Sequence, residues 1–201
     1  MYLLYADASG TPDMTDHSTE YVLVGLALPE SSWDEFAGAI NALKERYGLL
    51  HTNGELHAKD FCVTIAEQRK IENFEALSWE ERRHEVQAMR GALRGQLTGK
   101  KKAQKLTYHR NTEPFIHLSR RERSKLLIDV LDLVGNFRKL RLFGECIRKS
   151  DGKADIVAQA FEQLVSRFDS FLDRINARAG REYGRTQAGQ SRTFGRPSVR
   201  S

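Results

Sequence analysis

The sequence contains little cysteine and no long hydrophobic run. Its two cysteines, Cys62 and Cys146, lie far apart and outside any CxxC pair, so we expect no disulfide scaffold and no cysteine-rich zinc site, and we expect both thiols to be buried. No apolar stretch is long enough to span a bilayer. The first residues also lack the basic start and long apolar run of a secretory signal. The sequence therefore predicts a cytoplasmic protein with no membrane partner.

Several signatures of known chemistry are absent as well. The chain has no phosphate-binding loop of the GxGxxG or GxxxxGK[ST] type, and Ser9 lacks the GxSxG context of a serine nucleophile. No internal repeat is found, which excludes a repeat array. The candidates that remain for chemistry are acidic, basic and histidine residues.

Length and composition are typical of one soluble globular domain, with 201 residues of which 40% are hydrophobic. The net charge is +5, and much of this excess comes from arginines after Asp173. From Asn176 onward no periodicity of strand or helix survives. We therefore predict a single domain over residues 1–175, followed by a flexible Arg/Ser/Gly-rich tail over residues 176–201.

Apolar runs and capping signals predict an alternation of strands and helices. Runs over residues 2–6 and 20–28 predict two strands covered on both faces, joined by turn residues that favour an antiparallel pair. A third strand is predicted over residues 140–147. Ser-x-x-Glu starts at Ser32, Ser78 and Ser119 predict helices, and a long helix follows Gly152. The fold class expected is α/β, a layered fold with a mixed sheet and flanking helices.

Two of these helices show apolar residues at helical spacing, which predicts that they pack against a core. The residues expected to be buried are Leu127, Val130, Leu131 and Val134 in one helix, and Val157, Phe161, Leu164, Phe168 and Leu172 in the other.

Residues 95–117 are polar and basic, and predict a long loop. Its basic residues are the candidates for contacts with nucleic-acid phosphates: Lys100, Lys101, Lys102, Lys105 and Arg110. A solvated loop without a ligand is the alternative interpretation. His109 and His117 lie at the end of this stretch, where they could also reach nucleic acid, whereas His84 is expected on an exposed helix face.

Asp7 comes where the first apolar run gives way to Ser9 and Gly10. A strand end fixes the backbone while leaving the side chain accessible, and glycine lets the chain turn or approach a ligand closely. Asp7 is therefore a candidate catalytic or metal-binding carboxylate. The alternative is that it only caps the turn.

A second acidic segment reads Gly-Glu-Leu-His-Ala-Lys-Asp over residues 54–60. In an extended chain Glu55 and His57 point to the same side, and Asp60 follows just beyond them. Such carboxylates could hold Mg²⁺ or Mn²⁺, with His57 as a ligand, base or phosphate contact. An ordinary polar edge, with Lys59 paired to Asp60, is the alternative.

Taken together, the opening Tyr-Ala-Asp-Ala-Ser-Gly over residues 5–10 and the Glu-Leu-His segment over residues 55–57 resemble the bacterial family known as domain of unknown function 3800. The resemblance implies a ribonuclease-H-like fold and a divalent-metal-dependent nuclease or related phosphodiester-cleaving enzyme. By position, it implies that Asp7, Glu55 and His57 are catalytic and that Asp7, Glu55 and Asp60 bind the metal. Two ions about 4 Å apart would activate a water and stabilise the leaving oxygen.

Two positions depart from the family pattern. Ala8 stands where relatives usually carry an acid, and the apolar strand ending in aspartate that usually follows the long helix is not seen, as in a truncated or frame-shifted member. Glu145 is a candidate substitute for the missing carboxylate, with an outward polar role as the alternative. These departures leave open a second hypothesis, a catalytically degraded module that binds nucleic acid. A third is a protein-interaction module that oligomerises through an exposed sheet edge.

Overall fold

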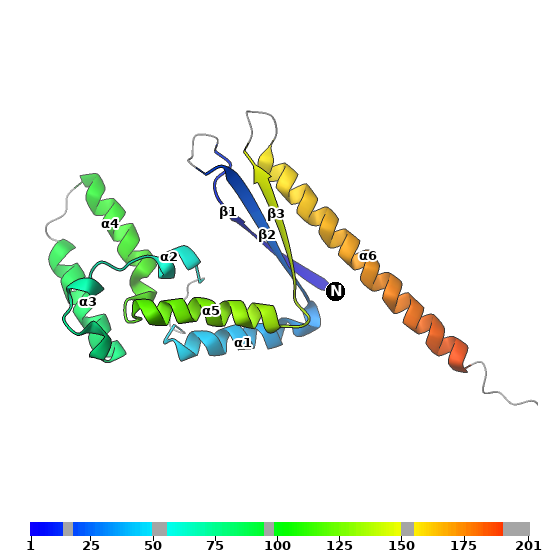
Figure 1. Ribbon diagram of the computed structural model, residues 1–201, viewed down its shortest axis with the longest axis horizontal. Coiled ribbons are helices and arrows are strands. Elements are labelled where there is room, and N and C mark those ends of the chain that lie inside the picture. The colour runs from blue at the N-terminus through cyan, green and yellow to red at the C-terminus, as the bar shows by residue number, and fades with distance from the viewer. Residues whose placement is uncertain (14–17, 50–55, 95–98, 150–154, 191–201) are drawn as a thin grey trace, which may run out of the picture. The chain divides into compact units, whose positions relative to one another are not determined.

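The computed structural model describes residues 1–13, 18–49, 56–94, 99–149 and 155–190. The chain divides into two compact units, each with its own hydrophobic cluster (Figure 1). The sheet unit comprises Met1–Ser31 and Lys139–Ser201, and the helical unit comprises Ser32–Arg138. Glu55 and the start of the basic segment, residues 95–98, lie outside the described residues.

The sheet unit contains three strands and one long helix, α6. The strands pair in the order β1-β2-β3, and all three were predicted: β1 spans Tyr2–Ser9, β2 spans Glu20–Pro29 and β3 spans Arg141–Arg148. Both pairings are antiparallel. The protein is thus of mixed α/β class, and the described strands form an antiparallel sheet where the sequence predicted a mixed one.

One face of this sheet packs on α6 (Figure 1). Gly25, near the middle of β2, allows the close approach, because a Cβ there would lie 2.9 Å from a methyl of Leu164 and 3.0 Å from a methyl of Leu4. The opposite face is more open, and Leu142 on it is 60% exposed. The expectation of cover on both faces is therefore wrong, since within the described part of the sheet unit a helix covers one face only.

Helix α6 spans Ile156–Gln190, so it continues beyond the predicted end near Arg174. Good helix formers such as Ala177 and Arg178 sustain it without any apolar pattern. Its buried residues are Ile156, Ala160 and Leu164. The predicted stripe is therefore correct at Leu164, but Val157 is exposed and Phe161 is 55% exposed. Phe168 and Leu172 are half-buried, so the error is confined to the start of the helix, where Ile156 and Ala160 take the buried positions.

The helical unit is built from five α-helices and short 3₁₀ turns over its described residues. The helices are α1 (Trp33–Arg46), α2 (Ala58–Cys62), α3 (Trp79–Arg94), α4 (Gly99–Thr112) and α5 (Arg120–Asn136). The 3₁₀ turns are Glu30–Ser32 at the junction of the two units, and Gln68–Lys70, Phe74–Ala76 and Glu113–Phe115.

Capping boxes fix two of these helix starts, as predicted. The Ser119 hydroxyl accepts from the Glu122 backbone N–H at 3.2 Å, and the Glu122 carboxylate accepts from the Ser119 N–H at 2.6 Å. Ser78 and Glu81 make the same reciprocal pair. Ser32 precedes α1 as expected but makes no capping hydrogen bond. Each reciprocal pair satisfies donors that the first helical turn would otherwise leave without a partner.

Two predictions for the helical unit are wrong. The stretch predicted as a loop contains α4, because its lysines, alanine and glutamine favour helix while giving no apolar stripe to detect. In α5 the predicted stripe is correct at Leu127 and Val130, which are half-buried and pack against the core beside the buried Leu126, but it is wrong at Leu131, which is exposed. None of the helices over the described ranges is long and apolar enough to cross a membrane.

Both cysteines are exposed, which overturns the prediction of buried thiols. Cys146 lies on β3 between Glu145 and Ile147, which take the two buried positions. Because successive strand residues face opposite sides, Cys146 lies on the more open face of the sheet. Cys62 is the last residue of the short helix α2.

The contact of Leu164 with the sheet predicts a large effect on stability. Leu164→Ala should lower the free energy of unfolding by about 2–5 kcal/mol, because it leaves a cavity under Gly25. Phe161→Ala, one turn away on the exposed side of α6, should lower it by less than about 1 kcal/mol. Urea denaturation followed by circular dichroism measures both, and equal losses would contradict the assigned buried face.

Candidate functional site

Asp7 lies near the end of β1 and is exposed. In the antiparallel register it faces Val24 of β2, which in turn faces Gly144 of β3. Leu4 and Gly25 belong to the face under α6, and Asp7 is three residues from Leu4, so it projects from the other face. The sequence-based expectation of an accessible carboxylate on the first strand is confirmed.

The surface beside Asp7 has room for a ligand. A Cβ placed at Gly144 would have nothing within 4 Å. At the register position of Asp7, β3 therefore has no side chain that would fill the surface. The Ala8 backbone N–H donates to Asp7 Oδ1 at 2.9 Å. This bond holds the carboxylate in place and leaves Oδ2 without a hydrogen bond from the described residues.

Gly10 has a different role from the one expected. Its φ is +90°, and a Cβ there would lie 2.9 Å from the carbonyl oxygen of Glu20. Glycine is needed because the chain turns in the left-handed region and passes close to β2. The space left by the absent side chain is therefore taken by backbone, and it does not serve a ligand at Asp7.

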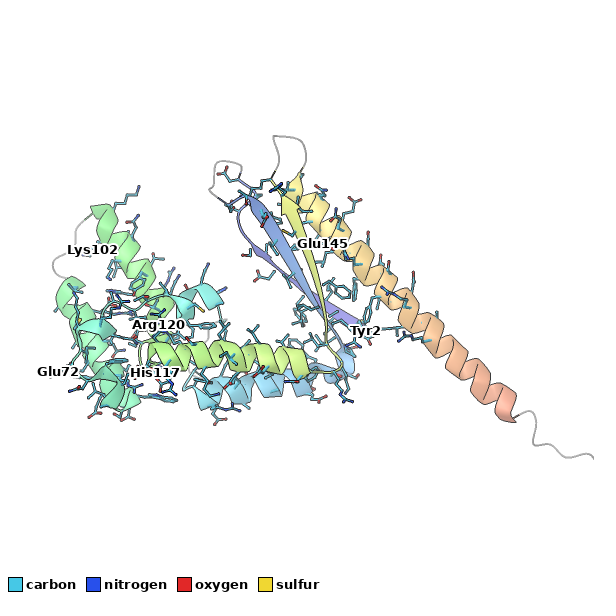
Figure 2. All side chains as sticks on the ribbon, in the orientation of Figure 1. Tyr2, Glu72, Lys102, His117, Arg120 and Glu145 are labelled. Carbon is cyan, nitrogen blue, oxygen red and sulfur yellow. The ribbon has the colours of Figure 1, made fainter. Side chains whose placement is uncertain are left out.

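Glu145 does not face the same side of the sheet as Asp7. It is paired in register with Leu23, a buried residue of the face under α6, and it is itself buried (Figure 2). Its carboxylate forms an ion pair with Arg167 of α6, with Arg167 Nη2 3.5 Å from Oε2. Neither interpretation of Glu145 holds: it is not an outward polar residue, and it cannot share a metal ion with Asp7.

The second acidic segment belongs to the helical unit, and the structure describes part of it. His57 is the exposed residue that precedes α2, and Asp60 is half-buried within that helix. The Asp60 backbone N–H donates to the His57 carbonyl at 2.9 Å. His57 itself has an extended backbone, as expected, and Asp60 lies in the short helix that follows it. Glu55, the third residue of this segment, lies outside the described residues.

The donor set is chemically suitable for a hard divalent cation but is incomplete over the described part of the chain. Asp7 and Asp60 supply carboxylate oxygens of the kind that Mg²⁺ and Mn²⁺ prefer. No group of three histidine, cysteine, aspartate or glutamate side chains that could hold a metal ion is found among the residues the structure describes. The predicted metal site therefore depends on Glu55.

The predicted phosphate contacts lie along α4. Lys102 and Arg110 are exposed there, as is Lys100 near its start, while the side chain of Lys101 lies outside the description. Lys105 differs from them, since its Nζ lies 3.1 Å from Glu67 Oε1 and 4.5 Å from the centre of the Tyr108 ring. Its charge is thus matched within the unit.

Glu67 is the centre of a buried polar cluster that the sequence did not reveal. Besides Lys105, its carboxylate contacts His109 Nε2 at 3.2 Å and lies 3.9 Å from Arg90. Burial acts to raise the pKa of Glu67, but hydrogen bonds from backbone and Lys105 and the charge of Arg90 outweigh it and lower the pKa. The carboxylate therefore stays ionised and anchors α4 from inside.

The two histidines expected near nucleic acid are both buried. Burial, together with the nearby charge of Arg90, lowers the pKa of His109. His117 Nε2 lies 2.9 Å from the Tyr47 carbonyl, and its Nδ1 lies 2.9 Å from Arg83. Because a carbonyl can only accept and a guanidinium can only donate, Nε2 carries the hydrogen and Nδ1 is bare. The ring is a neutral structural link, and neither histidine can reach a ligand at the surface.

Comparison with known proteins gave no match. A scan against protein-family models, a search of curated proteins and a search of solved structures each found none.

The environment of His117 predicts a pH dependence of stability. Burial lowers the pKa of His117, whereas in the unfolded chain it titrates near 6.5. Below about pH 6.5 the unfolded state therefore binds more protons, and the free energy of unfolding falls as the pH drops through the folded-state pKa. His117→Gln should flatten this fall, whereas His84→Gln, at an exposed residue of α3, should leave its slope unchanged. Chemical denaturation between pH 5 and 8 provides the comparison.

Proposed function

We propose that this protein is a divalent-metal-dependent nuclease of ribonuclease-H-like type, or a related phosphodiester-cleaving enzyme. The observation that carries the proposal is the position of Asp7, an exposed carboxylate on the first strand of an antiparallel sheet, on the face that α6 leaves open. The acidic residue on β1 is what the resemblance to domain of unknown function 3800 implies. The second acidic segment, with Glu55, His57 and Asp60, supplies the other proposed ligands.

In this proposal each group has a chemical task. Asp7, held through Oδ1 by the Ala8 N–H, presents its remaining oxygen as a ligand. His57, exposed before α2, positions a water or the scissile phosphate, and the carboxylates of Glu55 and Asp60 complete the acidic set. Mg²⁺ or Mn²⁺ would supply the Lewis acidity that phosphodiester hydrolysis requires. The exposed cations of α4 would contact the nucleic-acid backbone.

A second function is favoured by the position of Glu145. Ala8 stands where relatives usually carry an acid, so β1 lacks a second carboxylate beside Asp7. Glu145 of β3 is paired with Arg167 under α6, so β3 offers Asp7 no carboxylate either. A catalytically degraded module that binds nucleic acid would tolerate such a loss. Among the described strands β1 and β3 are the sheet edges, and pairing of a partner strand there is the protein-interaction version of this proposal.

Replacement of Asp7 tests the nuclease directly. Asp7→Asn should reduce Mg²⁺- or Mn²⁺-dependent cleavage of single- and double-stranded DNA and RNA by at least about a hundredfold, because an amide binds a hard cation far more weakly than a carboxylate. Its circular dichroism spectrum should be unchanged, since the side chain is exposed. Glu20→Gln, at an exposed carboxylate of β2, is the matched control. Equal cleavage by the parent and Asp7→Asn would contradict the proposal.

Binding without metal separates the two functions. A degraded module should bind oligonucleotides in EDTA, with an affinity that falls steeply as salt rises. Lys102→Ala combined with Arg110→Ala should then weaken binding and reduce the salt slope by about two, because each cationic side chain neutralises about one phosphate. Fluorescence anisotropy across a salt series measures the slope, and an unchanged slope would remove α4 as the nucleic-acid-binding surface.

A further inference from the structure

A cavity of about 210 Å³ lies in the helical unit, where the start of α5 meets residues 64–75. Three arginines line it, Arg69, Arg120 and Arg123, and Figure 2 marks Arg120 at the first turn of α5. Ile65 and Phe74 form an apolar part of the wall, and Glu75 contributes the one acidic side chain. None of these residues belongs to the acidic segments or to α4.

Arg123 places a buried positive charge in the wall of this cavity. Only 3% of it is exposed, and its terminal nitrogens donate to protein oxygens, with Nη1 2.8 Å from Gln68 Oε1 and 2.6 Å from the Leu118 carbonyl. Its Nε has no hydrogen-bond partner among the described residues although it is fully buried. A buried guanidinium donor without an acceptor is costly. Since Nε itself is fully buried, it is the positive charge of Arg123, and not this donor, that acts on an anion in the cavity.

The first turn of α5 adds further donors. The capping box uses the Ser119 hydroxyl and the Glu122 N–H, and the Arg123 N–H donates to the Ser119 carbonyl at 3.0 Å. The backbone N–H groups of Arg120 and Arg121 are left without an acceptor among the described residues. In a helix of 17 residues such free N–H groups and the helix dipole favour an anion at the N-terminus.

The charge of the cavity matches a dianion. Arg69 and Arg120 are exposed and make no side-chain ion pair within the described part of the chain, so their charges are available. With Arg123 they give three positive charges, and Glu75 removes one. Two net positive charges suit the dianionic phosphate of a monoester, which carries close to two negative charges at neutral pH. A planar guanidinium group can also donate two parallel hydrogen bonds to a pair of phosphate oxygens.

We propose that this cavity, defined by Arg69, Arg120 and Arg123 at the N-terminus of α5, binds a phosphate monoester group. The phosphate oxygens accept from the guanidinium groups and from the free N–H groups of the first turn. Ile65 and Phe74 keep the site partly dry, which strengthens these charge-assisted bonds. The source of the group is a small phosphorylated molecule or the phosphorylated end of a nucleic-acid strand. The inference does not rest on the nuclease proposal, because Asp7 takes no part in it.

The test uses the whole protein and measures dissociation constants by isothermal titration calorimetry at pH 7.5. The probes are inorganic phosphate and adenosine monophosphate. Arg69→Ala combined with Arg120→Ala removes two exposed guanidinium groups without touching the buried contacts of Arg123, and should weaken binding at least about tenfold. Arg121→Ala is the matched control, an exposed arginine on the same turn that does not line the cavity. It should change the constant by less than about twofold.

Three results would overturn the proposal. In the first, the parent protein binds neither probe at millimolar concentration. In the second, the double variant binds with the same dissociation constant as the parent. In the third, Arg121→Ala weakens binding as much as the double variant does. A further pair of probes, one oligonucleotide with a 5′-phosphate and the same strand with a 5′-hydroxyl, identifies the source. Tighter binding of the phosphorylated strand than of adenosine monophosphate identifies the ligand as the end of a strand. Tighter binding of adenosine monophosphate identifies it as a small molecule.

Asp7→Asn keeps this test separate from that of the nuclease. The variant should bind inorganic phosphate and adenosine monophosphate as the parent does, because the cavity lies wholly in the helical unit. Loss of cleavage with unchanged phosphate binding would support both proposals. Loss of phosphate binding in Asp7→Asn would overturn the cavity assignment alone.

Discussion

The antiparallel pairing of β1, β2 and β3 determines which face of the sheet each side chain occupies, and the chemistry of the sheet unit depends on it. Gly25 brings Leu164 of α6 close to the sheet, which fixes one face as the buried one. Every second residue must then point away from α6. Asp7 is therefore directed to the open face and Glu145 to the buried face. A shift of one residue in the β1–β2 pairing would turn Asp7 to the face under α6, and a shift of one residue in the β2–β3 pairing would turn Glu145 to the open face.

The helical unit depends on a different constraint. Its buried charged side chains need hydrogen-bond or ion-pair partners, and short connecting segments supply many of them. Its core contains Glu67, Arg90 and Arg123 in addition to apolar side chains. Arg90 donates to the His109 carbonyl and the Thr112 hydroxyl, and Glu67 is held by Lys105. Because each ion has protein partners, burial does not force it to lose its charge. Arg123 Nε, like Arg90 Nε and Glu67 Oε2, has no hydrogen-bond partner among the described residues.

The sequence predicted best what depends on neighbouring residues. The capping boxes at Ser78 and Ser119 were found where they were expected, since their hydrogen bonds lie within four residues of chain. The three strands were recognised for a similar reason. Helix α4 was missed because a polar helix has no apolar stripe, and its buried face is made by polar residues such as His109 and Thr112.

The candidate site was predictable only in part. An accessible Asp7 follows from a strand that ends in a turn, and this was correct. The environment of Glu145 was not predictable, since it requires the register of β3 with β2 and the position of Arg167 on a later helix. The cavity at α5 had no sequence signal either. Arg69 and Arg120 are about fifty residues apart in the chain, and only the packing of α5 on the preceding turns brings them together.

The buried arginines also bear on how the helical unit comes apart. Arg82 donates to the carbonyls of Phe74, Glu75 and His117 and to the Glu122 carboxylate, so one side chain ties a 3₁₀ turn to the approach and first turn of α5. Releasing any one of these segments would take away part of the hydrogen-bond partners of a cation in a dry interior. Fraying of a single turn is thereby suppressed, and amide protons across these turns should exchange with solvent in one concerted opening.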